Sequence, residues 1–168
     1  MIYYSEYMSP VGKLTVVSDG DFLTGIYFEG RFLNLNSAVK RSDLRILNET
    51  EKWLDIYFSG RKPDYTPAFK LNGVSDFTKS ALNKVKDIPY GKTATYGEIA
   101  RQLERDLGKR VSAQSVGGAA GRNPLPIIIP CHRVTGANGK LTGYSGGLDK
   151  KAALLKTEGI NYFIENKA

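Results

Sequence analysis

The pattern of apolar residues changes from strand-like to helix-like along the chain, and this change limits the folds that the sequence can adopt. Three short β-prone runs come first, over residues 2–7, 14–18 and 23–29. They are separated by residues 9–12 and 19–21, which hold the turn formers Ser, Pro, Gly and Asp. Short strands joined by tight turns indicate an antiparallel sheet.

A helix and then a linker follow these predicted strands. Apolar residues recur near helical spacing over residues 43–58 and predict a helix there. Residues 61–67 contain two prolines and no periodicity, which is typical of a linker. A chain of 168 residues can form one ordinary domain or two small ones. We expect two, over residues 1–72 and 73–168.

The second part of the chain has the spacing and the capping residues of several helices. Apolar residues predict a first helix over residues 77–85. Residues 95–98 match a capping box at the start of a second helix, which Gly108 can close. Ser112 can cap a third, shorter helix that runs through Ala120. The second and third helices together predict a helix-turn-helix unit.

A hairpin and a last helix complete this part. Residues 136–139 read Gly-Ala-Asn-Gly between apolar neighbours and favour a hairpin, which would be a wing beside the helix-turn-helix unit. A final helix is predicted from about Asp149 to Glu158, where Gly159 suits a left-handed cap. The expected fold class is therefore mixed, α/β (α+β), with a sheet followed by a winged helix-turn-helix unit.

Positive charge is concentrated in the second part. Residues 1–72 hold 9 Lys and Arg and 9 Asp and Glu, whereas residues 73–168 hold 15 and 8. The net charge of +7 therefore lies in the predicted helical part, which suggests a surface for a polyanion. On charge alone, a solvated surface that keeps the protein soluble explains the excess as well.

Composition argues against a membrane protein and against a metal site. No apolar run approaches the roughly 20 residues of a membrane span, and residues 1–6 lack the order of a signal peptide. We therefore expect a cytoplasmic protein with no membrane partner. The sequence has 1 Cys and 1 His, too few for an internal disulfide or for a typical zinc site. No metal is expected.

The single cysteine and the single histidine are adjacent, as Cys131 and His132. Three Ile residues and a proline precede them and Arg133 follows, which predicts a thiol delivered from a buried strand beside cationic groups. Most lone cysteines are small buried hydrophobic residues, and the residues alone leave that interpretation open. A thiol with a pKa of about 8.5 needs a neighbouring base or positive charge to act as a nucleophile.

His132 is the only histidine that could serve as this base. Adjacent side chains on an extended segment point in opposite directions, so His132 would need a bridging water or a turn to reach the sulfur. A third group would orient the imidazole. Spacing does not identify this group, and Glu158 is an acidic candidate.

The segment around the single cysteine resembles the active-site signature of the O6-alkylguanine-DNA alkyltransferases. It reads Asn-Pro-Leu-Pro-Ile-Ile-Ile-Pro-Cys-His-Arg-Val over residues 123–134. Residues 89–96, 115–119, 143–147 and 154–159 are also similar to the family, and they occur in the family's order. The resemblance covers nearly the whole chain.

This resemblance implies both a fold and a function. The fold would be a ribonuclease-H-like α/β domain over residues 1–72 and a winged helix-turn-helix domain with the active site over residues 73–168. The function would be DNA repair, by irreversible transfer of a methyl or other alkyl group from O6-alkylguanine to Cys131, once per molecule. O4-alkylthymine is a further substrate that the resemblance suggests. No cofactor is expected, because the group arrives on the DNA, and the protein would act as a monomer.

By the motif match, five residues are expected to take part in the chemistry: Cys131, His132, Glu158, Tyr96 and Asn123. Cys131 would accept the alkyl group, His132 would be its base through a water, and Glu158 would be the partner of His132. Tyr96 would donate a proton to the leaving guanine, and Asn123 would hold the turn before the active-site segment. A thiolate nucleophile and a phenol acid suit the displacement of a purine anion.

The expected partner is double-stranded DNA, bound through its minor groove with the alkylated nucleotide rotated out of the stack. Tyr144 and Ser145 would line the pocket for the flipped base. Small residues over 117–120 would let the short helix approach DNA closely, although core packing is the favoured interpretation for Val116 and one or two of the alanines. The expected DNA-binding residues are Gln114, Ser115, Gly117, Gly118, Ala119, Arg110, Arg122, Arg133, Val134, Tyr144 and Ser145.

Gln114 departs from the family pattern. Many members carry an arginine at this position, which fills the space that the flipped base leaves. Glutamine offers less stacking and no charge. Arg110 is the candidate to stand in for that arginine.

Two other classes of protein share parts of this pattern. A lesion-binding protein of the same fold would flag damage without repairing it, and it would lack the reactive cysteine that is present here as Cys131. A winged-helix DNA-binding regulator or a thiol hydrolase could match the motif by accident, although the match is broad. A regulator would repair nothing while Cys131 is intact.

Overall fold

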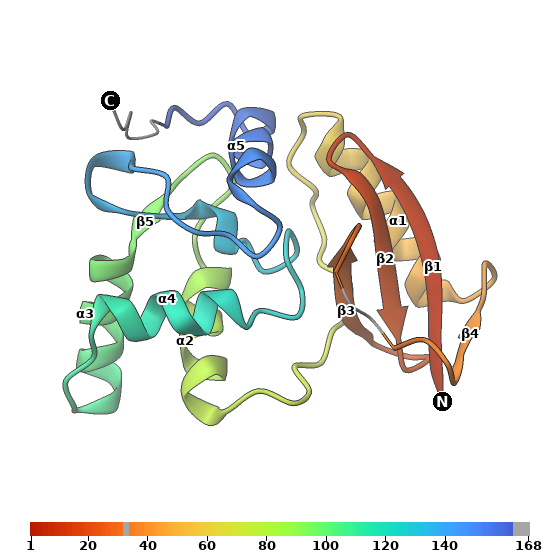
Figure 1. The fold of residues 1–168 in the computed structure, drawn as a ribbon, viewed down its shortest axis with the longest axis horizontal. Helices are drawn as coiled ribbons and strands as arrows, with labels where there is room; N and C mark the ends of the chain where they lie inside the picture. The colour runs from red at the N-terminus through yellow and green to blue at the C-terminus, as the bar shows by residue number, and fades with distance from the viewer. Residues whose placement is uncertain (32–33, 163–168) are drawn as a thin grey trace. The chain divides into compact units, whose positions relative to one another are not determined.

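The computed structural model describes residues 1–31 and 34–162 and divides into two compact units (Figure 1). The first unit is Met1–Asn72 and the second is Gly73–Ala168. Each unit has its own buried apolar residues. Within the described ranges, no helix is long and apolar enough to cross a membrane.

A four-stranded sheet is the framework of the first unit. β1 (Ile2–Ser9), β2 (Gly12–Ser18) and β3 (Leu23–Phe28) are antiparallel neighbours, which confirms the predicted antiparallel sheet. β4 (Ala38–Lys40) pairs in parallel with β1, so that the strand order is β3-β2-β1-β4. The sequence does not predict β4, because three residues are too few to show an alternating pattern.

α1 (Arg45–Phe58) packs on this sheet and confirms the predicted helix (Figure 1). Its buried face includes Leu47, Leu54 and Tyr57, whose side chains are fully buried. Trp53 on the same helix donates its indole N–H to the carbonyl oxygen of Tyr65 at 2.8 Å. The proline-containing segment expected as a linker is therefore fastened to the first unit.

Side-chain caps determine where the helices of the second unit begin. Ser75, Thr95 and Ser112 each accept a hydrogen bond from the backbone N–H three residues later, at 3.1 Å in every case. Gly108 ends one helix in the left-handed conformation, at φ +66°. The α-helices of this unit are α2 (Asp76–Lys86), α3 (Tyr96–Leu107), α4 (Ala113–Gly121) and α5 (Leu148–Thr157).

α3 and α4 pack against each other, which confirms the predicted helix-turn-helix pair. The hairpin expected around residues 136–139 forms its turn, but its first strand pairs with a different segment from the one predicted. Its turn forms, because Gly136 N–H donates to Lys140 O at 2.8 Å around a one-turn 3-10 helix, η2 (Ala137–Gly139). The strand before the turn, β6 (Val134–Thr135), pairs in parallel with β5 (Ala94–Thr95), which precedes α3.

Two exposed glycines of the second unit should respond in opposite ways to the same substitution. An added Cβ meets no atom within 4 Å at Gly108 or at Gly121, so only backbone conformation distinguishes them. Gly108→Ala should lower the free energy of unfolding by roughly 1–2 kcal/mol, because an L-residue is strained at positive φ. Gly121→Ala, at the helical end of α4, should raise it by up to about 1 kcal/mol. Urea unfolding checks both values, and equal effects of the two variants would contradict the prediction.

Candidate active site

A tight turn after α4 positions the cysteine. The run of three Ile residues at 127–129 predicts a buried strand, and this prediction is wrong. The three Ile residues are buried, but Ile127 adopts φ +75° and Ile129 N–H donates back to Leu125 O at 2.9 Å. The prolines on either side of these residues, Pro124, Pro126 and Pro130, lack the N–H groups that a strand ladder needs, which favours a turn.

Asn123 holds this turn closed with both ends of its amide. Its Oδ1 accepts from Leu125 N–H at 2.9 Å, and its Nδ2 donates to Ile129 O at 2.8 Å. The same Nδ2 lies 3.2 Å from Cys131 Sγ. The side chain is buried, so one residue both shapes the turn and touches the sulfur. This geometry agrees with the role expected of Asn123.

Cys131 begins a single 3-10 turn, η1 (Cys131–Arg133), and is 4% exposed. Burial raises the pKa of its thiol, whereas hydrogen bonds from Asn123 and Tyr144 and the positive charge of Lys151 oppose this effect without cancelling it. The sulfur is therefore a neutral thiol in the resting protein. A reaction at this sulfur needs a base to remove the proton.

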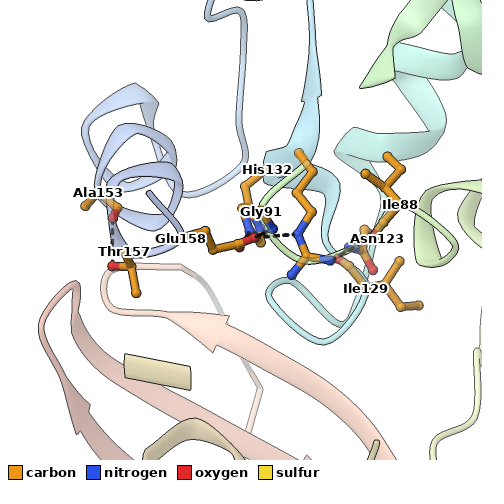
Figure 2. A network of polar contacts seen from close by, with 9 residues as sticks. Ile88, Gly91, Asn123, Ile129, His132, Ala153, Thr157 and Glu158 are labelled. Carbon is orange, nitrogen blue, oxygen red and sulfur yellow. Dashed lines mark hydrogen bonds and ion pairs between the residues drawn. The ribbon is translucent and has the colours of Figure 1, made fainter. Parts of the chain in front are cut away.

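His132 and Glu158 form a buried pair beside the cysteine. Figure 2 shows the side chain of Glu158 reaching from the end of α5 toward His132 and Gly91, and His132 Nε2 lies 2.5 Å from Glu158 Oε2. The other carboxylate oxygen, Oε1, accepts from Gly91 N–H at 3.0 Å and from Arg133 Nε at 2.8 Å. Glu158 caps the end of α5, which is how the fold brings it to a histidine 26 residues earlier in the chain.

The charges of this pair follow from its surroundings. Burial alone would raise the pKa of Glu158, but His132, Arg133 and the Gly91 N–H together lower it to about 2. Burial lowers the pKa of His132 despite the attraction of Glu158, so the imidazole is neutral when Glu158 is ionised. A neutral ring that donates Nε2–H to Glu158 accepts a proton at Nδ1. Within the described ranges, no group of three or more His, Cys, Asp or Glu side chains could hold a metal ion.

A cavity of about 520 Å³ reaches Cys131. It is bounded by α4 on one side and by the loop before α5 on another, and small residues of α4 form much of its wall. The cavity brings together the cysteine and several of the residues expected around a flipped base. Its lining residues are Tyr96, Ala113, Gln114, Gly117, Ala120, Gly121, Cys131, Thr142, Gly143, Tyr144 and Ser145.

Lys151 of α5 is a site residue that the sequence analysis missed. Its side chain is fully buried, and its Nζ donates to Val134 O at 2.7 Å, Thr142 O at 3.2 Å and Tyr96 Oη at 3.3 Å. Its pKa is lowered to about 8 by burial. The amine donates hydrogen bonds to carbonyl oxygens on both sides of the turn at 136–139, and these bonds hold the two backbone segments against α5. A lysine on the apolar face of the last predicted helix was the signal that could have revealed it.

Three residues expected to contact DNA are buried. Val134 and Ala119 have 0% exposure, and Arg133 has 7%. The guanidinium of Arg133 is directed to Glu158 inside the protein. The structure therefore does not present these three side chains to DNA, and their part in substrate or DNA binding stays a prediction. Ala119 packs in the core, which agrees with the interpretation that one or two of the alanines are structural.

The other expected DNA-binding residues remain at or near the surface. Gln114 and Gly118 are exposed on α4, and Arg110 and Arg122 are exposed just before and just after this helix. Ser115 is half-buried, and its hydroxyl donates to Ser112 O at 2.7 Å. Arg110 does not line the cavity, so it does not occupy the position of Gln114 in this structure.

Family comparisons agree with this geometry over nearly the whole chain. A model described as "6-O-methylguanine DNA methyltransferase, DNA binding domain" matches residues 76–160. A second, described as the ribonuclease-like domain of the same protein, matches residues 2–71. The chain belongs to the 6-O-methylguanine DNA methyltransferase family.

Individual members of this family are similar along their full length. A methylated-DNA–protein-cysteine methyltransferase of Methanosarcina acetivorans is 38% identical over 166 residues, which cover 94% of this chain and 99% of the relative. The protein of that name from Mycobacterium tuberculosis H37Rv is 39% identical over 158 residues, or 94% of this chain and 93% of the relative. A crystal structure of Mycobacterium tuberculosis OGT in complex with DNA has a TM-score of 0.82 at 37% identity and covers 93% of this chain and 92% of that one.

Removing the Asn123 amide should make the thiol harder to ionise. The Asn123 hydrogen bond favours the thiolate, so Asn123→Ala should raise the thiol pKa and slow alkylation by iodoacetamide at pH 8. Cys131 is the sole thiol of the sequence, so thiolate absorbance at 240 nm across a pH series reports it directly. Ser112→Ala, which removes a helix cap instead, is the control and should leave the thiol titration unchanged. If the thiol of Asn123→Ala titrates as in wild type, the Asn123 amide does not stabilise the Cys131 thiolate and the prediction is contradicted.

Proposed function

We propose that this chain repairs DNA by transferring a methyl or other alkyl group from guanine O6 to Cys131. The observation that carries the proposal is a buried thiol on the wall of a cavity, next to a His132–Glu158 pair. Relatives that are similar over the whole chain are named methylated-DNA–protein-cysteine methyltransferases, and a similar solved structure is a complex with DNA. A lesion-binding protein that repairs nothing would have no use for this thiol and its base.

In the proposed reaction, His132 first takes the thiol proton at Nδ1 through a bridging water. The carboxylate of Glu158 stabilises the imidazolium that results. A lone pair of the sulfur then attacks the alkyl carbon, so that an S–C bond forms as the C–O6 bond breaks. The electrons of the broken bond leave on guanine as a purine anion.

Tyr96 is the proposed acid for this anion. Its oxygen accepts hydrogen bonds from Thr142 Oγ1 at 3.2 Å and from Lys151 Nζ at 3.3 Å, which leaves its own proton for donation into the cavity. The positive charge of Lys151 stabilises the phenolate that forms. The imidazolium then returns a proton to Tyr96 through solvent, so the net change is one proton from sulfur to guanine.

The product thioether has no easy reversal, so each molecule would act once. No cofactor takes part in the proposed steps, because the alkyl group comes from the DNA. Since the substrate is DNA, we propose the cytoplasm as the place of action. We also propose that the protein acts as a monomer, because the residues that line the cavity at Cys131 all come from a single chain.

The DNA duplex would approach α4. A thiol at 4% exposure cannot reach a stacked base, so the nucleotide must rotate into the cavity at a cost of a few kcal/mol. Gly117 and Gly118 leave α4 thin enough for its backbone to lie in a minor groove, and Gln114 stands where α4 meets the cavity. Phosphate contacts would come from exposed cations such as Arg110 and Arg122, with little sequence preference.

The transfer itself is tested by the intact mass of the protein after mixing with a duplex that contains O6-methylguanine. We expect a gain of one methyl group, located on Cys131 by peptide mapping, and at most one guanine repaired per protein molecule. Cys131→Ala should show neither change. Repair of many lesions by an unmodified protein would exclude the single-turnover mechanism, and binding without any repair would favour the lesion-binding alternative.

Gln114→Arg should strengthen binding to duplex DNA, because it adds a cation beside the cavity mouth. If the new guanidinium pairs with a phosphate, the slope of log affinity against log salt should steepen by roughly 0.9. Gln114→Met, of similar length and without charge, is the matched control and should keep the original slope. Fluorescence anisotropy over a salt series measures both variants. Equal affinity of wild type and Gln114→Arg at every salt concentration would contradict the prediction.

A further inference from the structure

Arg133 is buried inside the second unit and contacts two segments distant in sequence. Its Nε donates to Glu158 Oε1 at 2.8 Å, and its Nη1 donates to Ile88 O at 2.8 Å. Its guanidinium carbon lies 5.6 Å from the centre of the Tyr90 ring. A guanidinium has fixed directions for its N–H groups, so these contacts hold Arg133 in one orientation.

This orientation assigns different partners to the two oxygens of Glu158. Oε1 is occupied by Arg133 Nε and by Gly91 N–H, and Oε2 is therefore the oxygen that meets His132 Nε2. Without Arg133, Oε1 would keep only the Gly91 contact, and the carboxylate could rotate about its terminal bond. The imidazole would then lose a fixed partner for its Nε2–H.

Arg133 also sets the charge balance around the imidazole. The charged groups that act on His132 are Glu158, Arg133 and Lys151, and Tyr90 faces the Glu158–Arg133 pair. Arg133 neutralises the charge of Glu158 in this buried site and lowers the pKa of His132. Removing the positive charge of Arg133 would leave the negative charge of Glu158 to act more strongly on the imidazole, which would raise the pKa of His132.

We propose that Arg133 is a positioning residue for alkyl transfer, which orients Glu158 toward His132 and keeps the imidazole neutral until the thiol of Cys131 gives up its proton. This inference rests on the proposed function. This role differs from the expected role of Arg133 in DNA binding, because the guanidinium makes its hydrogen bonds to groups inside the protein. Arg133 acts through Glu158 and His132 and touches neither the thiol nor the cavity.

The test is the rate of methyl transfer in a single turnover, measured from pH 5 to pH 9 with a duplex that contains O6-methylguanine. A protonated His132 cannot accept the thiol proton, so the rate falls as pH drops through the pKa of the ring. In Arg133→Gln this fall should begin at a higher pH, by roughly one unit, as expected when a neighbouring charge is removed. Arg133→Lys keeps the positive charge but loses the planar guanidinium with its fixed N–H directions. Its rate should therefore fall over the same acidic pH range (the acid limb) as that of wild type, while its maximal rate at higher pH (the plateau) should be lower.

Several outcomes would overturn the proposal for Arg133. One is an acid limb in Arg133→Gln that coincides with that of wild type. Another is an equal loss of rate in both variants at every pH, which would indicate a merely structural role. A third is weaker DNA binding with a shallower salt dependence, which would mean a phosphate contact. If Arg133→Gln does not fold, Arg133→Lys still tests the proposal. A maximal transfer rate in Arg133→Lys equal to that of wild type would refute the positioning role of Arg133.

The same experiment separates this inference from the proposed function. If the wild-type protein transfers no methyl group, the proposed function fails and the pH comparison has no rate to report. If the wild-type protein transfers the group and the Arg133 variants behave as wild type, only the inference about Arg133 fails. Circular dichroism of each variant establishes that the fold is intact before rates are compared.

Discussion

A buried carboxylate is stable only when other groups replace the water that it loses, and the Glu158 carboxylate has such groups on both oxygens. Its partners come from η1 and from the turn after α2, whereas Glu158 itself ends α5. The hydrogen bonds that stabilise the charge of Glu158 therefore form only when three segments of the second unit come together. The orientation of the proposed base depends on this meeting, and so does the path of the backbone that carries Cys131.

Burial has opposing consequences for the cysteine. It places the sulfur on the wall of the cavity that an alkylated base would enter, but it also raises the pKa of the thiol. The charge of Lys151 and the Asn123 amide reduce this penalty without removing it. The proposed chemistry therefore relies on a base that acts when the substrate is present, rather than on a thiolate already formed in the resting protein.

Much of the fold could be predicted from short stretches of sequence, because strands, caps and turns depend on residues close together in the chain. Ser112 and Thr95 cap the helices that they were expected to cap, and α1 lies where its apolar spacing placed it. Residues 127–129 show where such reasoning failed. Their composition favours a strand, but the Asn123 amide and the neighbouring prolines favour a closed turn.

The sequence by itself determined which groups are available: one thiol, one imidazole beside it, and helices whose ends are set by their own caps. These properties depend on residue identity and on contacts within a few residues. Only the tertiary structure decided that Arg133 turns inward to Glu158 and that Lys151 is buried beside Tyr96. Glu158 lies 26 residues from His132 and 67 from Gly91. Over such separations, the packing of whole helices decides which groups meet, because no local preference extends that far.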